Sequence, residues 1–154
     1  MGTKKTKKMI HIDASVSEVW NALTDPAIVK QYFFGTTVDS DWKEGSPITY
    51  SGEWKGKVYQ DKGIIKKIDK ERILSHTYWS NLSGIADIPD NYATVTYELH
   101  SKGDGTTLTI TQENKKGTEA EKAYENSGDN WEMVMQKMKD LLEKEYETRA
   151  NEII

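Results

Sequence analysis

The sequence predicts an α+β fold, in which an antiparallel sheet packs against a long C-terminal helix. Three observations lead to this prediction. Segments of alternating apolar and polar residues, separated by short turns, occupy the middle of the chain from Thr36 to Glu113. Two short helical patterns precede them, and one long amphipathic pattern follows them. No repeat or linker divides the 154 residues, so we expect a single domain, 1–154, with flexible tails at 1–6 and 148–154.

One strand and two short helices are expected before the main sheet. Residues 7–12 are predicted to form the first strand. Ser15 and Glu18 then match a capping box, and an apolar stripe at helical spacing follows them. Asp25 is placed to cap a second helix, and the proline after it suits the first helical position because an N–H there would have no partner. That helix should end before Gly35.

Short turns between the central strands indicate an antiparallel sheet. The links at 54–57, 69–72 and 102–105 are too short for the crossover that parallel strands need. The clearest hairpin pairs the alternating run at 93–99 with the run at 108–110. Two sets of side chains each share a face of their strand: Ile48, Tyr50 and Trp54 around Gly52, and Leu74, His76 and Tyr78.

A long amphipathic helix is expected at the C-terminal end of the chain. The polar segment 114–129 should begin irregularly, and the Ser-Gly-Asp triplet that ends it offers Asp129 as a helix cap. Such a helix needs a sheet to pack against. Its apolar stripe comprises Trp131, Val134, Met135, Met138, Leu141 and Leu142.

Composition excludes several classes of protein. The net charge of −4 gives no general attraction for phosphate backbones, so we expect no nucleic-acid partner, and we assign no function to the basic cluster at Lys4, Lys5, Lys7 and Lys8. Cysteine is absent, which rules out disulfides, thiolate nucleophiles and Cys-based metal sites. No stretch approaches the roughly 20 apolar residues of a membrane span, and the N-terminal segment lacks the apolar part of a signal peptide. We therefore expect a cytoplasmic protein.

The predicted order of elements is that of the helix-grip fold. Several segments resemble the activator of Hsp-90 ATPase homologue (AHSA-like) family, a branch of the START-like (SRPBCC) superfamily that also contains the birch pollen allergen (Bet v-like) relatives. The resembling segments are Ala14–Trp20, Leu23–Pro26, Gly63–Asp69, Arg72–Leu74, Thr94–Leu99, Gly105–Gln112 and Asn130–Glu132. The resemblance implies a curved antiparallel sheet of about six or seven strands wrapped round the last helix, with a cavity between them. The separate Hsp-90-binding domain of the eukaryotic co-chaperones has no counterpart in this sequence.

The sequence contains no familiar catalytic motif. His11, His76 and His100 all lie in predicted strands, without a second ligand at a metal-site spacing, and there is no GxSxG, P-loop or GxGxxG motif. We therefore expect no cofactor and no metal, and favour a non-catalytic protein over an enzyme. His76 differs from the other two histidines because Leu74 and Tyr78 flank it on one face. On a concave face it would be a polar group in an apolar wall, able to orient a ligand or to act as a weak acid or base.

Aromatic residues and methionines are the best candidates for the walls of the implied cavity. They give a wall polar handles and adaptable thioethers, although a plain core between sheet and helix also needs apolar side chains. Phe33 and Phe34 cannot both follow Tyr32 onto the core, because adjacent helical positions diverge by about 100°, so at least one ring should lie at the cavity rim or in solvent. The candidate ligand-binding residues are Phe33, Phe34, Tyr50, Trp54, His76, Tyr78, Tyr97, Trp131, Met135 and Met138.

Three functions are compatible with these features. The first is non-catalytic binding of a hydrophobic small molecule, such as a lipid, a polyketide or a flavonoid-like compound. The second is a chaperone-related or stress-related module that binds a protein partner through an exposed apolar patch at Tyr32, Phe33 and Phe34. The third is a cavity-based enzyme, such as a cyclase or hydrolase, for which only His76, Tyr50, Tyr78 and Tyr97 offer suitable groups.

Overall fold

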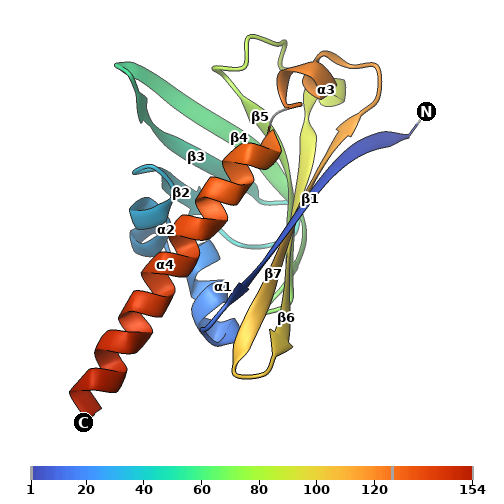
Figure 1. Ribbon diagram of the computed structural model, residues 1–154. Helices are drawn as coiled ribbons and strands as arrows, with labels where there is room; N and C mark the ends of the chain where they lie inside the picture. The colour runs from blue at the N-terminus through green and yellow to red at the C-terminus, as the bar shows by residue number, and fades with distance from the viewer. Residues whose placement is uncertain (1, 126, 154) are drawn as a thin grey trace.

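The computed structural model describes residues 2–125 and 127–153, except for the side chains of Trp54, Ser127 and residues 145–153. Figure 1 shows the arrangement of the helices and strands. In chain order they are β1 (Thr3–Ile12), α1 (Val16–Thr24), α2 (Pro26–Tyr32), β2 (Thr37–Ser40), β3 (Pro47–Trp54), β4 (Lys57–Asp69), β5 (Ile73–Ser80), the 3₁₀ turn η1 (Pro89–Asn91), β6 (Ala93–Lys102), β7 (Gly105–Lys115), α3 (Glu119–Ala123) and α4 (Ser127–Ile153).

The described strands form one seven-stranded sheet in the order β1-β7-β6-β5-β4-β3-β2, and every neighbouring pair is antiparallel. Helix α4 crosses one face of this sheet, with α1 and α2 towards one end and α3 at the other (Figure 1). The α+β, helix-grip architecture predicted from the sequence is therefore confirmed. None of the described helices is long and apolar enough to cross a membrane.

The caps of the first two helices are those that the sequence predicts. The Ser15 hydroxyl accepts a hydrogen bond from the backbone N–H of Glu18 at 3.1 Å, which begins α1. A carboxylate oxygen of Asp25 accepts from the N–H of Ala27 at 2.9 Å, and α2 then starts at Pro26. The predicted hairpin between 93–99 and 108–110 is also present, with Lys102 facing Gly105 at its turn.

Regular structure extends further at both ends of the chain than expected. Strand β1 begins at Thr3 rather than at Lys7, because the long β7 offers partners as far as Lys115. Helix α4 runs to Ile153. Parts of both segments expected to be flexible tails, 1–6 and 148–154, therefore belong to a strand or a helix.

The start of α4 differs from the predicted one. The helix begins at Ser127, so Asp129 lies in its first turn instead of capping it. Gly128, the middle residue of the Ser-Gly-Asp triplet, is buried against β1, where an added Cβ would lie 3.0 Å from a Thr6 methyl carbon. The glycine thus permits close approach of helix and strand, a packing role that its sequence context does not reveal.

The hydrophobic core fills the space between the sheet and helices α1, α2 and α4. The apolar stripe of α4 contributes Val134, Met135, Met138 and Leu142, all buried. They pack with side chains from the inner face of the sheet, among them Ile48, Leu74, Val95 and Ile110. A ligand site between the sheet and α4 has to lie beside these packed side chains.

A candidate ligand-binding site between two helices and the sheet

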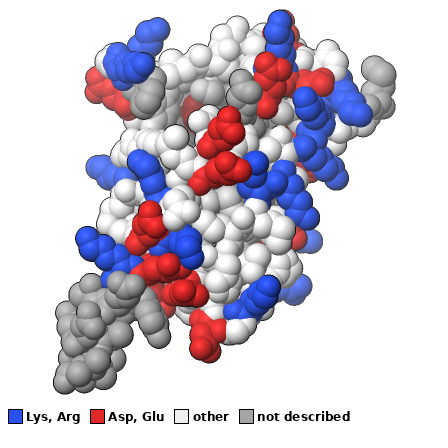
Figure 2. Space-filling view, viewed as in Figure 1, with Lys and Arg blue, Asp and Glu red and all other residues white. Residues whose placement is uncertain are grey.

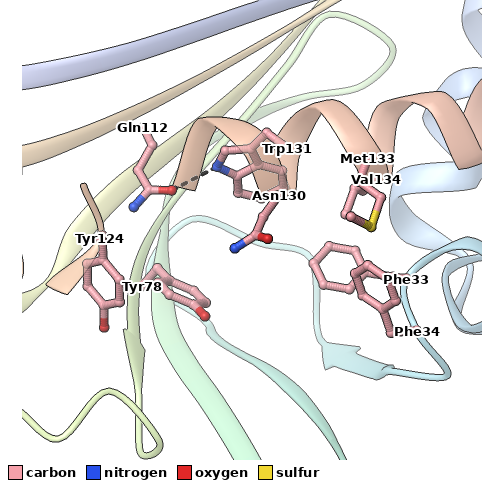
Figure 3. Close-up of a pocket in the computed structure, with 9 residues that line it drawn as sticks. All are labelled: Phe33, Phe34, Tyr78, Gln112, Tyr124, Asn130, Trp131, Met133 and Val134. Atoms are coloured by element: carbon pink, nitrogen blue, oxygen red, sulfur yellow. Dashed lines mark hydrogen bonds between the residues drawn. The ribbon is translucent and has the colours of Figure 1, made fainter. Parts of the chain in front are cut away.

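A pocket of about 330 Å³ lies where the end of α2 and the first turns of α4 meet the inner face of the sheet (Figure 3). This volume is at the small end of the roughly 300–1,000 Å³ typical of small-molecule sites. None of the described residues in its walls is charged. The walls are formed by Phe33, Phe34, Tyr78, Gln112, Tyr124, Asn130, Trp131, Met133 and Val134.

The apolar end of the pocket is built by the chain reversal that closes α2. The N–H of Gly35 donates to the carbonyl of Lys30, a Schellman-type closure, and this places Phe34 in the left-handed region at φ +53°. A glycine is usual at such a position, since a larger side chain costs about 1–2 kcal/mol there. The ring of Phe34 is 44% exposed at the pocket, and the ammonium of Lys137 lies 4.7 Å from its centre. A strained aromatic residue held at a pocket mouth favours a binding role for that ring.

Trp131 separates the pocket from the core. Its indole packs edge-on against Phe33 and Tyr97, with ring centres 6.3 Å and 5.9 Å away. Phe33 stacks on Tyr50, and His76 lies between Tyr50 and Tyr97, with each of these ring centres 5.7–5.8 Å apart. Each of these five rings packs against two of the others, so the middle of the domain is filled at this point. The pocket therefore lies to one side of the rings, towards α3.

Polar groups occupy the opposite end of the pocket. The indole N–H of Trp131 donates to Oε1 of Gln112 at 2.8 Å, the bond drawn in Figure 3. Gln112 is only 3% exposed, and its Nε2 has no hydrogen-bond partner among the described residues. The Tyr78 hydroxyl donates to a carboxylate oxygen of Asp61 at 2.7 Å, and the ring of Tyr124 packs edge-on against Tyr78. The pocket is therefore amphipathic along its length, with aromatic and thioether groups at one end and an unpaired amide donor at the other.

The structure brings four of the ten candidate ligand-binding residues together at this pocket: Phe33, Phe34, Tyr78 and Trp131. Among the described residues, Tyr50, Tyr97 and Met138 border a void of about 10 Å³, and His76 and Met135 are buried in the core. Trp54 lies in β3, but its side chain is outside the described residues. Tyr32, expected in an exposed patch, is buried, and its hydroxyl donates to the carbonyl of Ala22.

His76 is buried between the aromatic rings of Tyr50 and Tyr97. It is 1% exposed, and Nδ1 lies 2.7 Å from the carbonyl of Thr77, which fixes the proton on Nδ1 because a carbonyl can only accept. Burial lowers the pKa of His76 to about 4, against a smaller opposing effect of the Thr77 hydrogen bond. The imidazole is consequently neutral at neutral pH, and the rings of Tyr50 and Tyr97 pack against it.

Five wall residues were not among the sequence candidates: Gln112, Tyr124, Asn130, Met133 and Val134. Gln112 could have been found, since period-two alternation along β7 places it on the same face as Leu108 and Ile110. Val134 was assigned to the helical stripe but not to the cavity. Tyr124 follows a five-residue helix in a polar segment, and no sequence signal places it opposite Tyr78.

No metal-binding cluster is found within the described part of the chain. Groups of three or more His, Asp or Glu side chains that could hold a metal ion do not occur there. Acidic and basic side chains are mixed along α4 (Figure 2), whereas the charged residues of β1 are all lysines. The β1 lysines that the sequence showed as a cluster include two paired ones: Lys8 lies 2.7 Å from Glu132, and Lys5 lies 3.6 Å from Glu113.

Comparison with known families decides the relationship of this chain. Residues 13–143 match the family model described as "Activator of Hsp90 ATPase homolog 1-like protein". The chain belongs to this family. The resemblance inferred from the sequence segments is thereby confirmed. The matched residues include every described residue of the pocket wall.

Several solved structures share the fold of this chain. ChR145 from Cytophaga hutchinsonii is 41% identical with a TM-score of 0.78, and the match covers 96% of this chain and 99% of that one. CalU16 from Micromonospora echinospora is 24% identical, with a TM-score of 0.66 and coverage of 89% and 73%. A structure described as the Aha1 dimer from Colwellia psychrerythraea is 17% identical, with a TM-score of 0.69 and coverage of 90% and 96%. The last two show the fold alone. No curated protein matches the sequence.

Proposed function

We propose that this protein binds a hydrophobic small molecule in the pocket between α2, α4 and the sheet, without transforming it. The observation that carries the proposal is a 330 Å³ hollow beside an otherwise packed core, walled by Phe33, Trp131 and their neighbours. Burial of an apolar ligand there gains about 25 cal/mol per Å² of apolar area removed from water. Flat aromatic compounds, such as flavonoid-like or polyketide-derived molecules, suit the ring-lined walls better than a long flexible lipid.

The composition of the walls favours binding over catalysis. Of the four residues considered for chemistry, only Tyr78 reaches the pocket, and its hydroxyl is already engaged with Asp61. His76 lies behind Tyr50 and Tyr97 and is neutral near pH 7. A general acid or base must lie within hydrogen-bonding reach of the reacting group, which His76 does not.

A protein partner at the pocket mouth is the second candidate. Phe34 and Met133 are 44% and 49% exposed, and both border the same opening. Large apolar side chains that meet at an exposed rim are typical of interaction sites. A stress-related role and a cytoplasmic location stay predictions.

The proposal is tested with a neutral fluorescent probe, N-phenyl-1-naphthylamine, titrated into the purified protein. We expect saturable binding of one probe per chain. Met133→Trp places an indole at the pocket mouth and should weaken probe affinity by about tenfold, because the added ring takes up ligand volume. The matched control is Leu82→Trp, since Leu82 is exposed to a similar degree but lies outside the pocket.

Two results would argue against small-molecule binding. Probe fluorescence that never saturates would indicate adsorption to the surface rather than a site. Equal affinities of wild type and Met133→Trp would place the probe elsewhere on the protein. Native mass spectrometry of the protein purified from cells adds an independent measurement, because a retained ligand appears as a defined added mass.

A further inference from the structure

Gln112 lies in the pocket wall, and its side-chain Nε2 is a buried hydrogen-bond donor with no partner among the described residues. Trp131 Nε1–H can only donate, so the Gln112 atom that faces it must be the carbonyl oxygen Oε1. This bond fixes the orientation of the amide, and Nε2 is necessarily the other end. Figure 3 shows Nε2 turned away from Trp131, on the side of Tyr124 and Tyr78.

An unpaired donor at this position is costly unless something accepts from it. Gln112 is only 3% exposed, and its Nε2 has no partner among the described residues. Burying a polar group without a hydrogen bond is unfavourable, because the group loses its bonds to water and gains none. Such groups are few in natural proteins, and one in a pocket wall is explained by a bound ligand or water that completes it. The Gln112 amide is therefore positioned to hold an acceptor atom inside the pocket.

The charges around this end of the pocket select the kind of acceptor. None of the described residues in its walls carries a cationic side chain. The Asp61 carboxylate lies behind this wall and accepts from the Tyr78 hydroxyl at 2.7 Å. A ligand carboxylate beside Gln112 would meet this negative charge without a compensating cation, whereas a neutral carbonyl would not. Lys137, the cation nearest the other end, lies outside over the ring of Phe34.

We propose that the pocket selects flat apolar molecules that carry a neutral carbonyl group, with the carbonyl oxygen accepting from Gln112 Nε2 and the apolar body lying towards Phe33, Phe34 and Met133. This inference rests on the proposed binding function and adds the chemical class and the orientation of the ligand. Asn130, on the same stretch of α4 as Trp131, offers a second amide at the pocket wall.

The experiment compares three probes of nearly the same shape by isothermal titration. They are 2-acetylnaphthalene, which has a ketone, 2-isopropenylnaphthalene, in which a methylene replaces the ketone oxygen, and 2-naphthoate, which is an anion near pH 7. Wild type should bind the ketone about tenfold more tightly than the alkene, since one satisfied buried donor separates them. The naphthoate should bind more weakly than the ketone.

Variants assign the preference to Gln112. In Gln112→Met the ketone-to-alkene affinity ratio should fall to about one, because the side chain keeps its length and loses the donor. Gln112→Glu keeps an acceptor for Trp131 but has no amide donor, so its ketone-to-alkene affinity ratio should also fall to about one. The matched control is Asn114→Leu: Asn114 is a buried amide two residues further along β7 that lies outside the pocket, so the ratio should be unchanged. In wild type, the side-chain NH₂ resonances of Gln112 should shift with the ketone and not with the alkene.

The outcomes separate this inference from the proposed function. Equal binding of ketone and alkene to wild type would overturn the carbonyl preference and leave the binding function intact. A ratio that survives in Gln112→Met would overturn the role of Gln112, and naphthoate bound as tightly as the ketone would overturn the preference for a neutral group. Failure of both neutral probes to bind wild type would overturn the binding function and this inference with it.

Discussion

The Tyr32 hydroxyl supplies a hydrogen bond that the helical backbone cannot make. The carbonyl of Ala22 near the end of α1 would normally accept from the N–H four residues later, but that residue is Pro26, which has none. Tyr32 is buried, and its hydroxyl donates to this carbonyl at 2.5 Å. A side chain of α2 thus completes α1 and fixes the angle between the helices that precede Phe33 and Phe34.

Tyr32→Phe should lower the free energy of unfolding by about 1–2 kcal/mol, because a buried carbonyl loses its donor. Urea unfolding at pH 7 measures this, with an unchanged m-value indicating that the unfolded state is the same. Tyr92→Phe is the matched control, since the Tyr92 hydroxyl bonds Asp87 at the surface, and its loss should cost less than about 0.5 kcal/mol. Equal losses in the two variants would contradict the proposed role of Tyr32.

At the scale of elements, strands β4 and β5 approach each other closely at Gly63. A Cβ added there would lie 1.7 Å from the carbonyl oxygen of Thr77, an impossible contact with backbone. The next N–H, that of Ile64, donates to the Thr77 hydroxyl at 2.8 Å, and the register shifts between Ile65 and Lys67. The glycine therefore permits a local distortion of the sheet beside Tyr78, a residue of the pocket wall.

Gly63→Ala should cost about 3 kcal/mol or more, because backbone rather than a side chain must move. Gly52→Ala should cost less, since its added Cβ would meet the Tyr59 side chain, which can rotate. Thermal and urea unfolding of both variants, followed by circular dichroism, check the order. A Gly63→Ala protein as stable as wild type would mean that the two strands separate without penalty.

The sequence predicted the elements more fully than their contacts. The Ser15 and Asp25 caps follow from local hydrogen-bonding chemistry, and the hairpin of β6 and β7 follows from alternation and a four-residue turn. The predicted start of α4 was wrong because Gly128 acts through its close approach to Thr6, which lies on a strand more than a hundred residues away in the chain. Short-range patterns carry no information about such an approach.

At the scale of the whole molecule, the buried His76 makes stability depend on pH. Its pKa is about 4 in the folded protein, against an ordinary value of 6.5, mainly because burial disfavours the charged imidazole. The stability that this group contributes is complete above about pH 6.5. As the pH falls towards 4, the unfolded chain takes up a proton that the folded protein excludes, so the folded state loses stability.

Between pH 7.5 and pH 5, wild type should lose about 2 kcal/mol more unfolding free energy than His76→Phe, which cannot take up the proton. Urea unfolding of both proteins at a series of pH values measures the difference. His100→Gln, at an exposed histidine on β6, should keep the wild-type slope. Parallel pH profiles of wild type and His76→Phe would show that His76 is not the group responsible.

The sequence by itself determined the fold class, the order of the elements, the helix caps and the aromatic and methionine character of the inner face, because each depends on residues close together in the chain. Tertiary structure decided which of those side chains border open space. His76 packs between Tyr50 and Tyr97 in the core, while Gln112 and Tyr124 line the pocket. Alternation along a strand tells which face a residue occupies. Only the crossing position of α4 over the sheet tells whether that part of the face is covered or open.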